Sequence, residues 1–301
     1  MSQFQDFNKL FRLDGKVALI TGGSRGLGLH TATAFLQAGA SRVIITARKA
    51  EGEHGINQAV AKLNALPRIN GSAVGIAANV ANTGEIIALV EKIRKTEGTL
   101  DILVPNAGAT WGSKFEDAPD ESNVKILDLN VRGVFTLVQK FLPLLEAAGT
   151  RRDPSRVIIV SSTAAVNVPH VGENGTIMYS VSKAAAHHLG RNLAIELGPR
   201  NITTNVVAPG FFPSKLASGL IEKLGGEEEL NASNPRKRLG IPEDIAGVMV
   251  YLASPAGSYI NGEDISVDGG SSSTPAHADS MVVLTRFQKS GERIACIAAP
   301  I

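Results

Sequence analysis

The chain has 301 residues and a mass of 31.5 kDa, enough for one large α/β domain or two small ones. Apolar residues make up 44% and charged residues 19%, a balance that excludes an intrinsically disordered chain. The formal net charge is +2, from 30 basic and 28 acidic residues, so nothing favours a nucleic acid or an anionic membrane as a partner.

Cysteine content and the N-terminal residues indicate the compartment. The single cysteine, Cys296, excludes an intrachain disulfide framework and is typical of a reducing environment. The chain begins without the basic and then apolar pattern of a secretory signal. The chain has no run of about 18 apolar residues, so no membrane span is predicted. We therefore expect a soluble, cytoplasmic protein.

Apolar runs of strand length alternate with helical patterns along most of the chain. The first run, residues 16–20 (KVALI), is of the kind found in strands buried on both faces of a parallel sheet. Further strands are predicted over residues 42–46, 72–77, 100–104, 156–160, 203–208 and 264–267. Helices are predicted over residues 29–38, 58–66, 85–95, 122–145, 178–197 and 242–253, with Gly133 and Pro143 as weak points of the longest.

This alternation predicts an α/β Rossmann fold, a doubly wound parallel sheet of seven strands with helices on both faces. Without a composition break, residues 1–270 are expected to form one domain that holds the cofactor and substrate sites together. Residues 271–301 form a C-terminal extension of unknown role. Its two short apolar runs could add an edge strand, pack on a neighbouring subunit or be loosely ordered.

A glycine-rich turn follows the first strand and opens the first helix. Its sequence, residues 21–28 (TGGSRGLG), has the spacing G-x-x-x-G-x-G. Glycines let the backbone approach a pyrophosphate, and the helix N-terminus offers free N–H groups and the positive end of a dipole. This context favours a dinucleotide site over a tight turn without a ligand.

The end of the second strand indicates which dinucleotide is preferred. A carboxylate there would bind the adenosine ribose and repel a 2′-phosphate. This chain instead has Arg48 and Lys49, with Arg25 in the glycine turn. Because guanidinium groups bind phosphate in a bidentate manner, we expect NADP(H) rather than NAD(H). The alternative is that Arg48 and Lys49 are merely solvated surface charges.

Tyr179 and Lys183 lie four residues apart on a predicted helix, so they share one face. A phenol has a pKa near ~10, and an ammonium one turn away should lower that pKa toward neutrality. The pair is therefore a candidate for acid–base chemistry. Alone, it could equally be two polar residues on a solvated helix face.

Together, these motifs resemble the short-chain dehydrogenase/reductase family over about residues 13–270. The glycine turn, Asn106-Ala107-Gly108 and Pro209-Gly210 stand in that family's order, and residues 235–246 and 267–270 look most like 3-oxoacyl-(acyl-carrier-protein) reductases. The resemblance implies a catalytic tetrad of Asn130, Ser162, Tyr179 and Lys183. The cofactor residues that follow from the turn and the resemblance are Gly22, Ser24, Arg25, Gly26, Leu27, Gly28, Arg48, Asn79, Val80, Asn106, Ala107, Gly108, Tyr179, Lys183, Pro209, Gly210, Phe212 and Ser214.

Three positions depart from the family pattern. Asn79 stands where Asp usually binds the adenine amino group, although an amide oxygen can still accept that bond. Pro105 stands where Asn is common. Ser162 precedes Tyr179 by 17 residues, a longer gap than is usual, which enlarges a loop expected to border the substrate. Ser161 and Thr163 are the alternatives for the serine's role.

By resemblance, NADPH would deliver a hydride to a carbonyl carbon while Tyr179 supplies the proton. Ser162 would hydrogen-bond the oxygen, Lys183 would hold the nicotinamide ribose, and Asn130 would position a water that links Lys183 to solvent. The expected substrate is a partly apolar ketone, such as a β-ketoacyl thioester. Alternatives are a dehydrogenase of secondary alcohols or polyols, and a non-catalytic NADP-binding scaffold.

Two expectations concern metals and partners. The six histidines are scattered, and His187 and His188 are adjacent rather than one turn apart, so no metal site is predicted. These two histidines are expected on the helix surface or at a subunit contact. The helices at residues 122–145 and 178–197 resemble the family's subunit-contact helices, which implies a homodimer or homotetramer.

Overall fold

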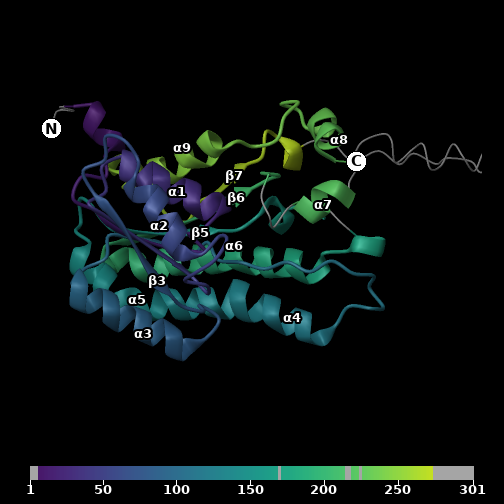
Figure 1. Cartoon of the computed structure of the whole chain (residues 1–301), viewed down its shortest axis with the longest axis horizontal. Coiled ribbons are helices and arrows are strands. Elements are labelled where there is room, and N and C mark those ends of the chain that lie inside the picture. Colours follow the sequence, from purple (N-terminus) through teal and green to yellow (C-terminus); the bar gives the residue numbers. More distant parts are fainter. Residues whose placement is uncertain (1–5, 169–170, 214–217, 224–225, 274–301) are drawn as a thin grey trace, which may run out of the picture.

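The computed structural model describes residues 6–168, 171–213, 218–223 and 226–273. Its seven strands are β1 Val17–Thr21, β2 Arg42–Ala47, β3 Ser72–Ala77, β4 Ile102–Val104, β5 Ser155–Val160, β6 Ile202–Pro209 and β7 Asp264–Val267. They form one parallel sheet in the order β3-β2-β1-β4-β5-β6-β7, which confirms the predicted doubly wound sheet (Figure 1). The order reverses between β1 and β4, where such sheets bind their ligands.

Helices cover both faces of the sheet, as the side chains of β1 illustrate. Ala18 and Ile20 belong to one buried cluster and Leu19 to the other, because successive strand residues point to opposite faces. The first cluster packs α1 Gly26–Gln37, α2 Ile56–Asn64 and α9 Pro242–Ala253 on the sheet. The second packs α3 Thr83–Thr96, α5 Gly133–Ala148 and α6 Ile177–Leu197.

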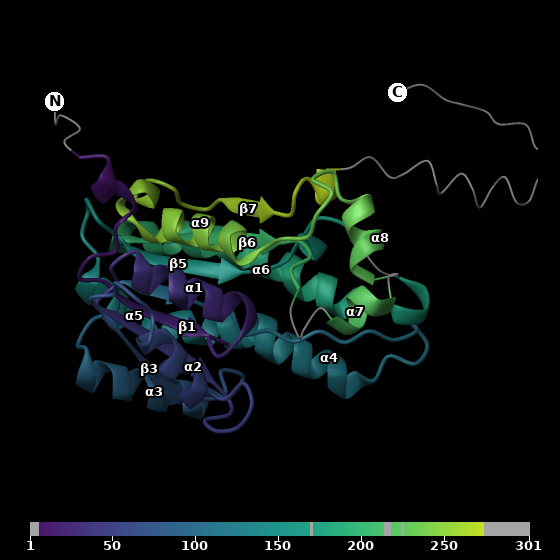
Figure 2. The same ribbon diagram turned by 45° about the horizontal axis from the view of Figure 1, so that its top comes forward.

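Three further helices are α4 Asp120–Leu127, α7 Ser218–Lys223 and α8 Gly226–Ser233. Figure 2 shows the strand arrows pointing toward α7 and α8, so the carboxyl ends of the strands open on that side of the molecule. Single 3-10 turns lie at Asn8–Phe11, Thr163–Ala165, Gly172–Asn174, Gly198–Arg200, Pro255–Gly257 and Ser271–Ser273. Within the described ranges, no helix is both long and apolar enough to cross a membrane.

The long helix predicted over residues 122–145 differs from the prediction at its centre. The backbone runs from α4 into a π-helical turn, Asp128–Arg132, and then into α5, which contains Pro143. Such turns inside α-helices are frequent at functional sites. Gly133 has a packing reason, since a Cβ at that position would lie 2.6 Å from the carbonyl oxygen of Val80. The helix can therefore approach the end of β3 closely.

Candidate active site

The glycine turn is held by the strands on either side of it. The backbone N–H of Gly22 donates to the carbonyl of Thr46 at 2.7 Å, and Gly22 itself has φ +66°, which favours glycine. A Cβ at Gly28 would lie 2.5 Å from the Gly22 carbonyl oxygen, so the turn closes tightly on the start of α1. The residue before α1, Arg25, makes no side-chain cap. The first N–H groups of the helix are therefore available to an anion.

The side chain of Asn106 ties this turn to the end of β4. Its amide Nδ2 donates to the carbonyls of Thr21 at 2.7 Å and Gly22 at 3.3 Å. The Thr21 hydroxyl accepts the backbone N–H groups of Asn106 and Ala107 at 3.0 and 2.9 Å. Asn106 and Ala107 thus hold the glycine turn against the end of β4.

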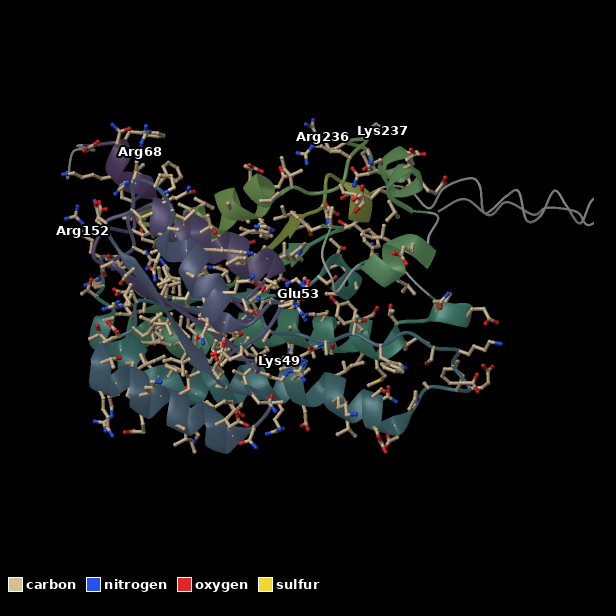
Figure 3. The ribbon with its side chains drawn as sticks, in the orientation of Figure 1. Lys49, Glu53, Arg68, Arg152, Arg236 and Lys237 are labelled. Carbon is tan, nitrogen blue, oxygen red and sulfur yellow. The ribbon has the colours of Figure 1, made fainter. Side chains whose placement is uncertain are left out.

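Two arginines stand at the position expected for a 2′-phosphate. Arg25 and Arg48 are exposed, and neither guanidinium group makes a hydrogen bond or ion pair within the described part of the chain. Arg48 follows β2 directly, and Figure 3 labels its neighbour Lys49. These free cations, together with the uncapped start of α1, are the donors that a phosphorylated dinucleotide requires.

Asn79 and Val80 follow β3. The Asn79 Oδ1 accepts the N–H of Ala81 at 3.2 Å, and its backbone N–H donates to the Glu85 carboxylate at 2.7 Å. The amide oxygen has a second lone pair, so it can still accept a bond from an adenine amino group.

The remaining residues predicted to bind the cofactor lie at the end of β6, which is Pro209, and directly after it. Gly210 packs against Asp268, since a Cβ at Gly210 would lie 2.7 Å from the Cβ of Asp268. The Phe212 side chain is buried and packs on Gly240, so a contact of Phe212 with a nicotinamide would come from its backbone. Ser214 lies outside the described residues.

Asn130 sits in the π-helical turn, and its carboxamide is held by three hydrogen bonds. Oδ1 accepts the N–H of Ala109 at 3.0 Å, and Nδ2 donates to the carbonyl of Ala109 at 2.9 Å and to Ser182 Oγ at 3.0 Å. Ser182 Oγ in turn donates to the carbonyl of Tyr179 at 2.7 Å. The amide therefore connects the strand end at β4 with the helix that carries Tyr179 and Lys183.

Lys183 is buried at the carboxyl end of β5. Its Nζ donates to the carbonyl of Val160 at 3.1 Å and lies 5.6 Å from the centre of the Tyr179 ring. The part of the chain that the structure describes gives Lys183 no carboxylate partner. Burial lowers the pKa of Lys183 to about 8.

The pKa of Tyr179 shifts in the direction opposite to the one predicted from the sequence. Burial raises the pKa of the phenol, and a hydrogen bond with Ser162 lowers it by less. The prediction considered only the nearby ammonium and not the loss of water around the ring. Ser162, the preferred serine, also accepts the N–H of Ala164 at 3.2 Å. The alternative Ser161 instead donates to the carbonyl of Lys183, which ties β5 to α6.

The long gap between Ser162 and Tyr179 forms a loop that contacts the loop after β4. The backbone N–H of Ser113 donates to the carbonyl of Gly175 at 3.1 Å, and Lys114 Nζ lies 3.0 Å from the Glu173 carboxylate. Trp111 and Val168, on these two loops, are 52% and 80% exposed. Apolar side chains on these two loops are therefore open to solvent.

The two histidines of α6 differ, although both were expected at the surface or at a subunit contact. His188 lies on the surface beside Arg191 and Ile195, whereas His187 is buried. Its Nδ1 lies 3.1 Å from Asp264 Oδ2, and burial lowers its pKa. Helical spacing from Lys183 could have indicated this. No group of three or more His, Cys, Asp or Glu side chains that could hold a metal ion is present among the described residues.

Comparisons with known proteins identify the family. A family model described as enoyl-(acyl carrier protein) reductase matches residues 22–272. The rhamnolipids biosynthesis 3-oxoacyl-(acyl-carrier-protein) reductase of Pseudomonas aeruginosa is 39% identical over 260 residues, which cover 86% of this chain and 97% of that protein. The 7α-hydroxysteroid dehydrogenase of Escherichia coli is 34% identical over 260 residues, with 86% and 95% covered.

Solved structures agree. The Pseudomonas aeruginosa RhlG/NADP active-site complex matches with a TM-score of 0.80 at 37% identity and covers 88% of this chain and 99% of that one. A 3-ketoacyl-(acyl-carrier-protein) reductase from Brucella melitensis complexed with NADH matches with a TM-score of 0.75 at 30% identity, with 86% and 99% covered. The chain belongs to the short-chain dehydrogenase/reductase family and is an oxidoreductase of CH–OH or ketone groups.

Proposed function

We propose that this protein uses NADPH to reduce a ketone, such as a β-ketoacyl thioester or a related carbonyl, to a secondary alcohol. The observation that carries the proposal is the arrangement of Tyr179 between its partner Ser162 and the buried Lys183. The phenol carries a proton at neutral pH, because an ordinary phenol already does so and burial raises the pKa of Tyr179 further, so Tyr179 holds the proton that the reaction requires.

In the proposed reaction, a nicotinamide held by these residues would supply the hydride for the carbonyl carbon. The Tyr179 hydroxyl donates its proton to the carbonyl oxygen. Ser162 donates a hydrogen bond to that oxygen as negative charge develops on it. Lys183 holds the nicotinamide ribose and restores the proton of Tyr179, and Asn130 positions the water that resupplies Lys183.

The preference for NADPH rests on Arg25 and Arg48. Both guanidinium groups are exposed and make no ion pair in the described part of the chain, so a phosphate would not compete with an internal carboxylate. A solved relative is a complex with NADP and another is a complex with NADH, so the family alone does not decide the cofactor.

The proposed substrate class rests on two observations. The matched relatives include 3-oxoacyl-(acyl-carrier-protein) reductases, which supports a ketoacyl group. Trp111 and Val168 offer exposed apolar surface on the loops beside Tyr179, which suits an acyl chain. The hydroxysteroid dehydrogenases among the relatives support a second candidate, the oxidation of a secondary alcohol on a larger apolar skeleton.

We also propose a homodimer or homotetramer formed through α4, α5 and α6. Val124, Phe135, Val181 and Ile195 on these helices are 50%, 47%, 50% and 80% exposed. A second copy of the chain would remove this apolar surface from water.

The proposed function is tested by following NADPH oxidation with diketones and acetoacetyl thioesters, and NADP⁺ reduction with secondary alcohols and hydroxysteroids. We expect the thioesters and diketones to be turned over, and Tyr179→Phe to abolish turnover while NADPH binding changes little. Retained turnover in Tyr179→Phe contradicts the mechanism. Tight NADPH binding without turnover on either panel would favour a scaffold protein.

A further inference from the structure

The helix that carries Tyr179 and Lys183 has a buried histidine one turn further along. Tyr179, Lys183 and His187 follow one another at intervals of four residues on α6, so their side chains lie one above the other. Arg191 comes one turn later and is exposed. The proposed reaction uses Tyr179 and Lys183 but has no task for His187.

Asp264 connects this part of α6 to β7, the strand at the edge of the sheet (Figure 2). Its Oδ2 lies 3.1 Å from His187 Nδ1 and also accepts a hydrogen bond from Arg191 Nη1. Asp264 is the first residue of β7 and is paired with Val206 of β6, so the strand ladder fixes its place. One carboxylate oxygen therefore holds two successive turns of the helix.

The hydrogen bond between His187 and Asp264 has a defined direction. A carboxylate can only accept, so Nδ1 is the nitrogen of His187 that carries the proton. Burial lowers the pKa of His187, and the positive charges of Arg191 and Lys183 act in the same direction. The attraction of Asp264 opposes these effects without outweighing them. At neutral pH the imidazole is therefore neutral and donates through Nδ1.

Fold stability alone does not explain this polar pair. His187 Nε2 and Asp264 Oδ1 are buried and form no hydrogen bond within the described residues. Buried polar atoms without partners cost free energy, and apolar residues of similar volume are often as stable or more stable at such positions. One turn away, α6 contacts β6 through an apolar approach, since a Cβ at Gly190 would lie 2.4 Å from Val206 Cγ2. Apolar packing has no direction, whereas a hydrogen bond does.

The contacts of α6 near the tetrad come from three sides. Asn130 donates to Ser182 Oγ, on the side of the loop after β4. Ser161, after β5, donates to the carbonyl of Lys183. The pair of His187 with Asp264 adds a contact on the side of β7. Three directional contacts on different sides determine how a helix is rotated about its own axis.

We propose that His187 and Asp264 are positioning residues, whose hydrogen bond fixes the rotation of α6 and thereby directs Tyr179 and Lys183 toward the substrate and the cofactor. This inference rests on the proposed function, because Tyr179 and Lys183 are the groups that it positions.

The test compares His187→Leu with His187→Asn. Leucine fills the buried position without a donor, whereas asparagine places an N–H near the position of Nδ1. We expect kcat per NADPH-binding site to fall about tenfold to a hundredfold in His187→Leu, since a misplacement of about 1 Å can cost that much, while Tm stays the same or rises. KM for NADPH should change less than kcat. His187→Asn should keep most of the wild-type kcat.

Wild-type kcat per NADPH-binding site in His187→Leu, or an equal loss in His187→Asn, would overturn the inference. Asp264→Ala and Asp264→Asn repeat the comparison from β7 and decide it if His187→Leu does not fold. The amide oxygen of Asp264→Asn can still accept the Nδ1 proton, so this variant should keep more activity than Asp264→Ala. The reverse order would also overturn the inference.

Glu146→Ala is the matched control. Glu146, on α5, pairs with Arg200 just beyond the end of α6 opposite Tyr179, so this variant also removes an ion pair beside the helix. Its kcat should equal that of the wild type. Tyr179→Phe separates the two claims. If it is inactive and His187→Leu is normal, only the inference on His187 fails; if it is active, the proposed function fails.

Discussion

The parallel strands begin at one end of the sheet, here called the amino edge, and finish at the other, the carboxyl edge. At the amino edge, Lys16 Nζ lies 3.0 Å from Asp101 Oδ1 and 2.7 Å from Asp153 Oδ2. At the carboxyl edge, Lys183 Nζ donates to the carbonyl of Val160 and has no carboxylate partner within the described ranges. Lys16 directly precedes β1, and Lys183, on α6, contacts the end of β5; both lysines are largely withdrawn from water. Only one of them has a charge partner.

The difference reverses the direction of the pKa shift. Burial alone would lower the pKa of Lys16, but hydrogen bonds and charge attraction to Asp153 and Asp101 together outweigh burial and raise it. Burial acts on Lys183 unopposed and lowers its pKa to about 8. A lysine paired with carboxylates is fixed as a cation and stabilises the fold, whereas a buried lysine paired only with a carbonyl can exchange its proton.

Arg156, at the amino edge, is also paired with a carboxylate. Its side chain is 2% exposed, and its Nη2 donates to Asp153 at 3.0 Å and to the carbonyl of Ser254 at 3.2 Å. Burial lowers the pKa of Arg156, and Asp153 opposes that effect. Lys16 and Arg156 are thus paired with carboxylates at this edge, whereas Arg25, Arg48 and Lys183 have no carboxylate partner within the described ranges.

Lys183→Met should have the largest effect on activity and little effect on the fold. Removal of the ammonium would take away the group that we propose to hold the ribose and to return the proton to Tyr179, so we expect kcat/KM to fall at least about a thousandfold. Methionine removes a buried charge that has no carboxylate partner within the described ranges, so Tm should stay the same or rise. Steady-state kinetics and a thermal melt test both parts. Activity near that of the wild type would contradict the role of Lys183.

Lys16→Met should show the reverse pattern. It leaves Asp101 and Asp153 without their shared cation, so we expect a loss of about 1–3 kcal/mol in the free energy of unfolding. The kcat of the folded enzyme should be unchanged. Lys62→Met, at an exposed position of α2 that forms no ion pair, is the control and should leave the stability unchanged. Urea unfolding measures the difference, and equal stability of both variants would refute the comparison.

Arg48→Asp should have a smaller and more selective effect. An aspartate would repel a 2′-phosphate and accept ribose hydroxyls, so the NADPH-to-NADH ratio of kcat/KM should fall about tenfold or more. Arg152→Asp makes the same charge change before β5, at the amino edge, where Figure 3 labels Arg152 away from α7 and α8. Its cofactor ratio should equal that of the wild type. An unchanged cofactor ratio in Arg48→Asp would contradict this role and indicate that Arg48 is only a solvated surface charge.

Much of this arrangement was predictable from the sequence because it follows from local patterns. The strand at Ser72–Ala77 and the helix at Pro242–Ala253 have the predicted bounds, since a buried apolar run and a proline at the first helical position mark them clearly. The predicted site residues gather at the carboxyl ends of the strands, as the strand order requires. The glycine turn, Asn106 and Ser162 follow strands, and Tyr179 lies on α6.

Other features depend on contacts between distant segments. The π-helical turn at Asn130 fits a helix against Val80 and Ala109, which no local pattern shows. The pKa of Tyr179 depends on how much water its ring loses, and the burial of His187 depends on where β7 places Asp264.

The titration of Lys183 tests the contrast between the two lysines most directly. The unfolded chain holds this proton up to the ordinary pKa of 10.5, and the folded chain only up to about 8. Below pH 8 the folded protein therefore bears the full cost of burying the Lys183 ammonium, and this cost is relieved as the pH rises to 10.5. The stability of the wild type relative to Lys183→Met should increase over that window. The raised pKa of Lys16 gives stability that is complete below pH 10.5 and is lost only above it.

The free energy of unfolding should be measured from pH 7 to 10 for the wild type, Lys183→Met and Lys16→Met. We predict that the wild type gains on Lys183→Met as the pH rises above 8, by an amount on the order of 3 kcal/mol over the whole window. Its difference from Lys16→Met should stay constant. A constant difference from Lys183→Met would show that Lys183 keeps its proton and would contradict the account.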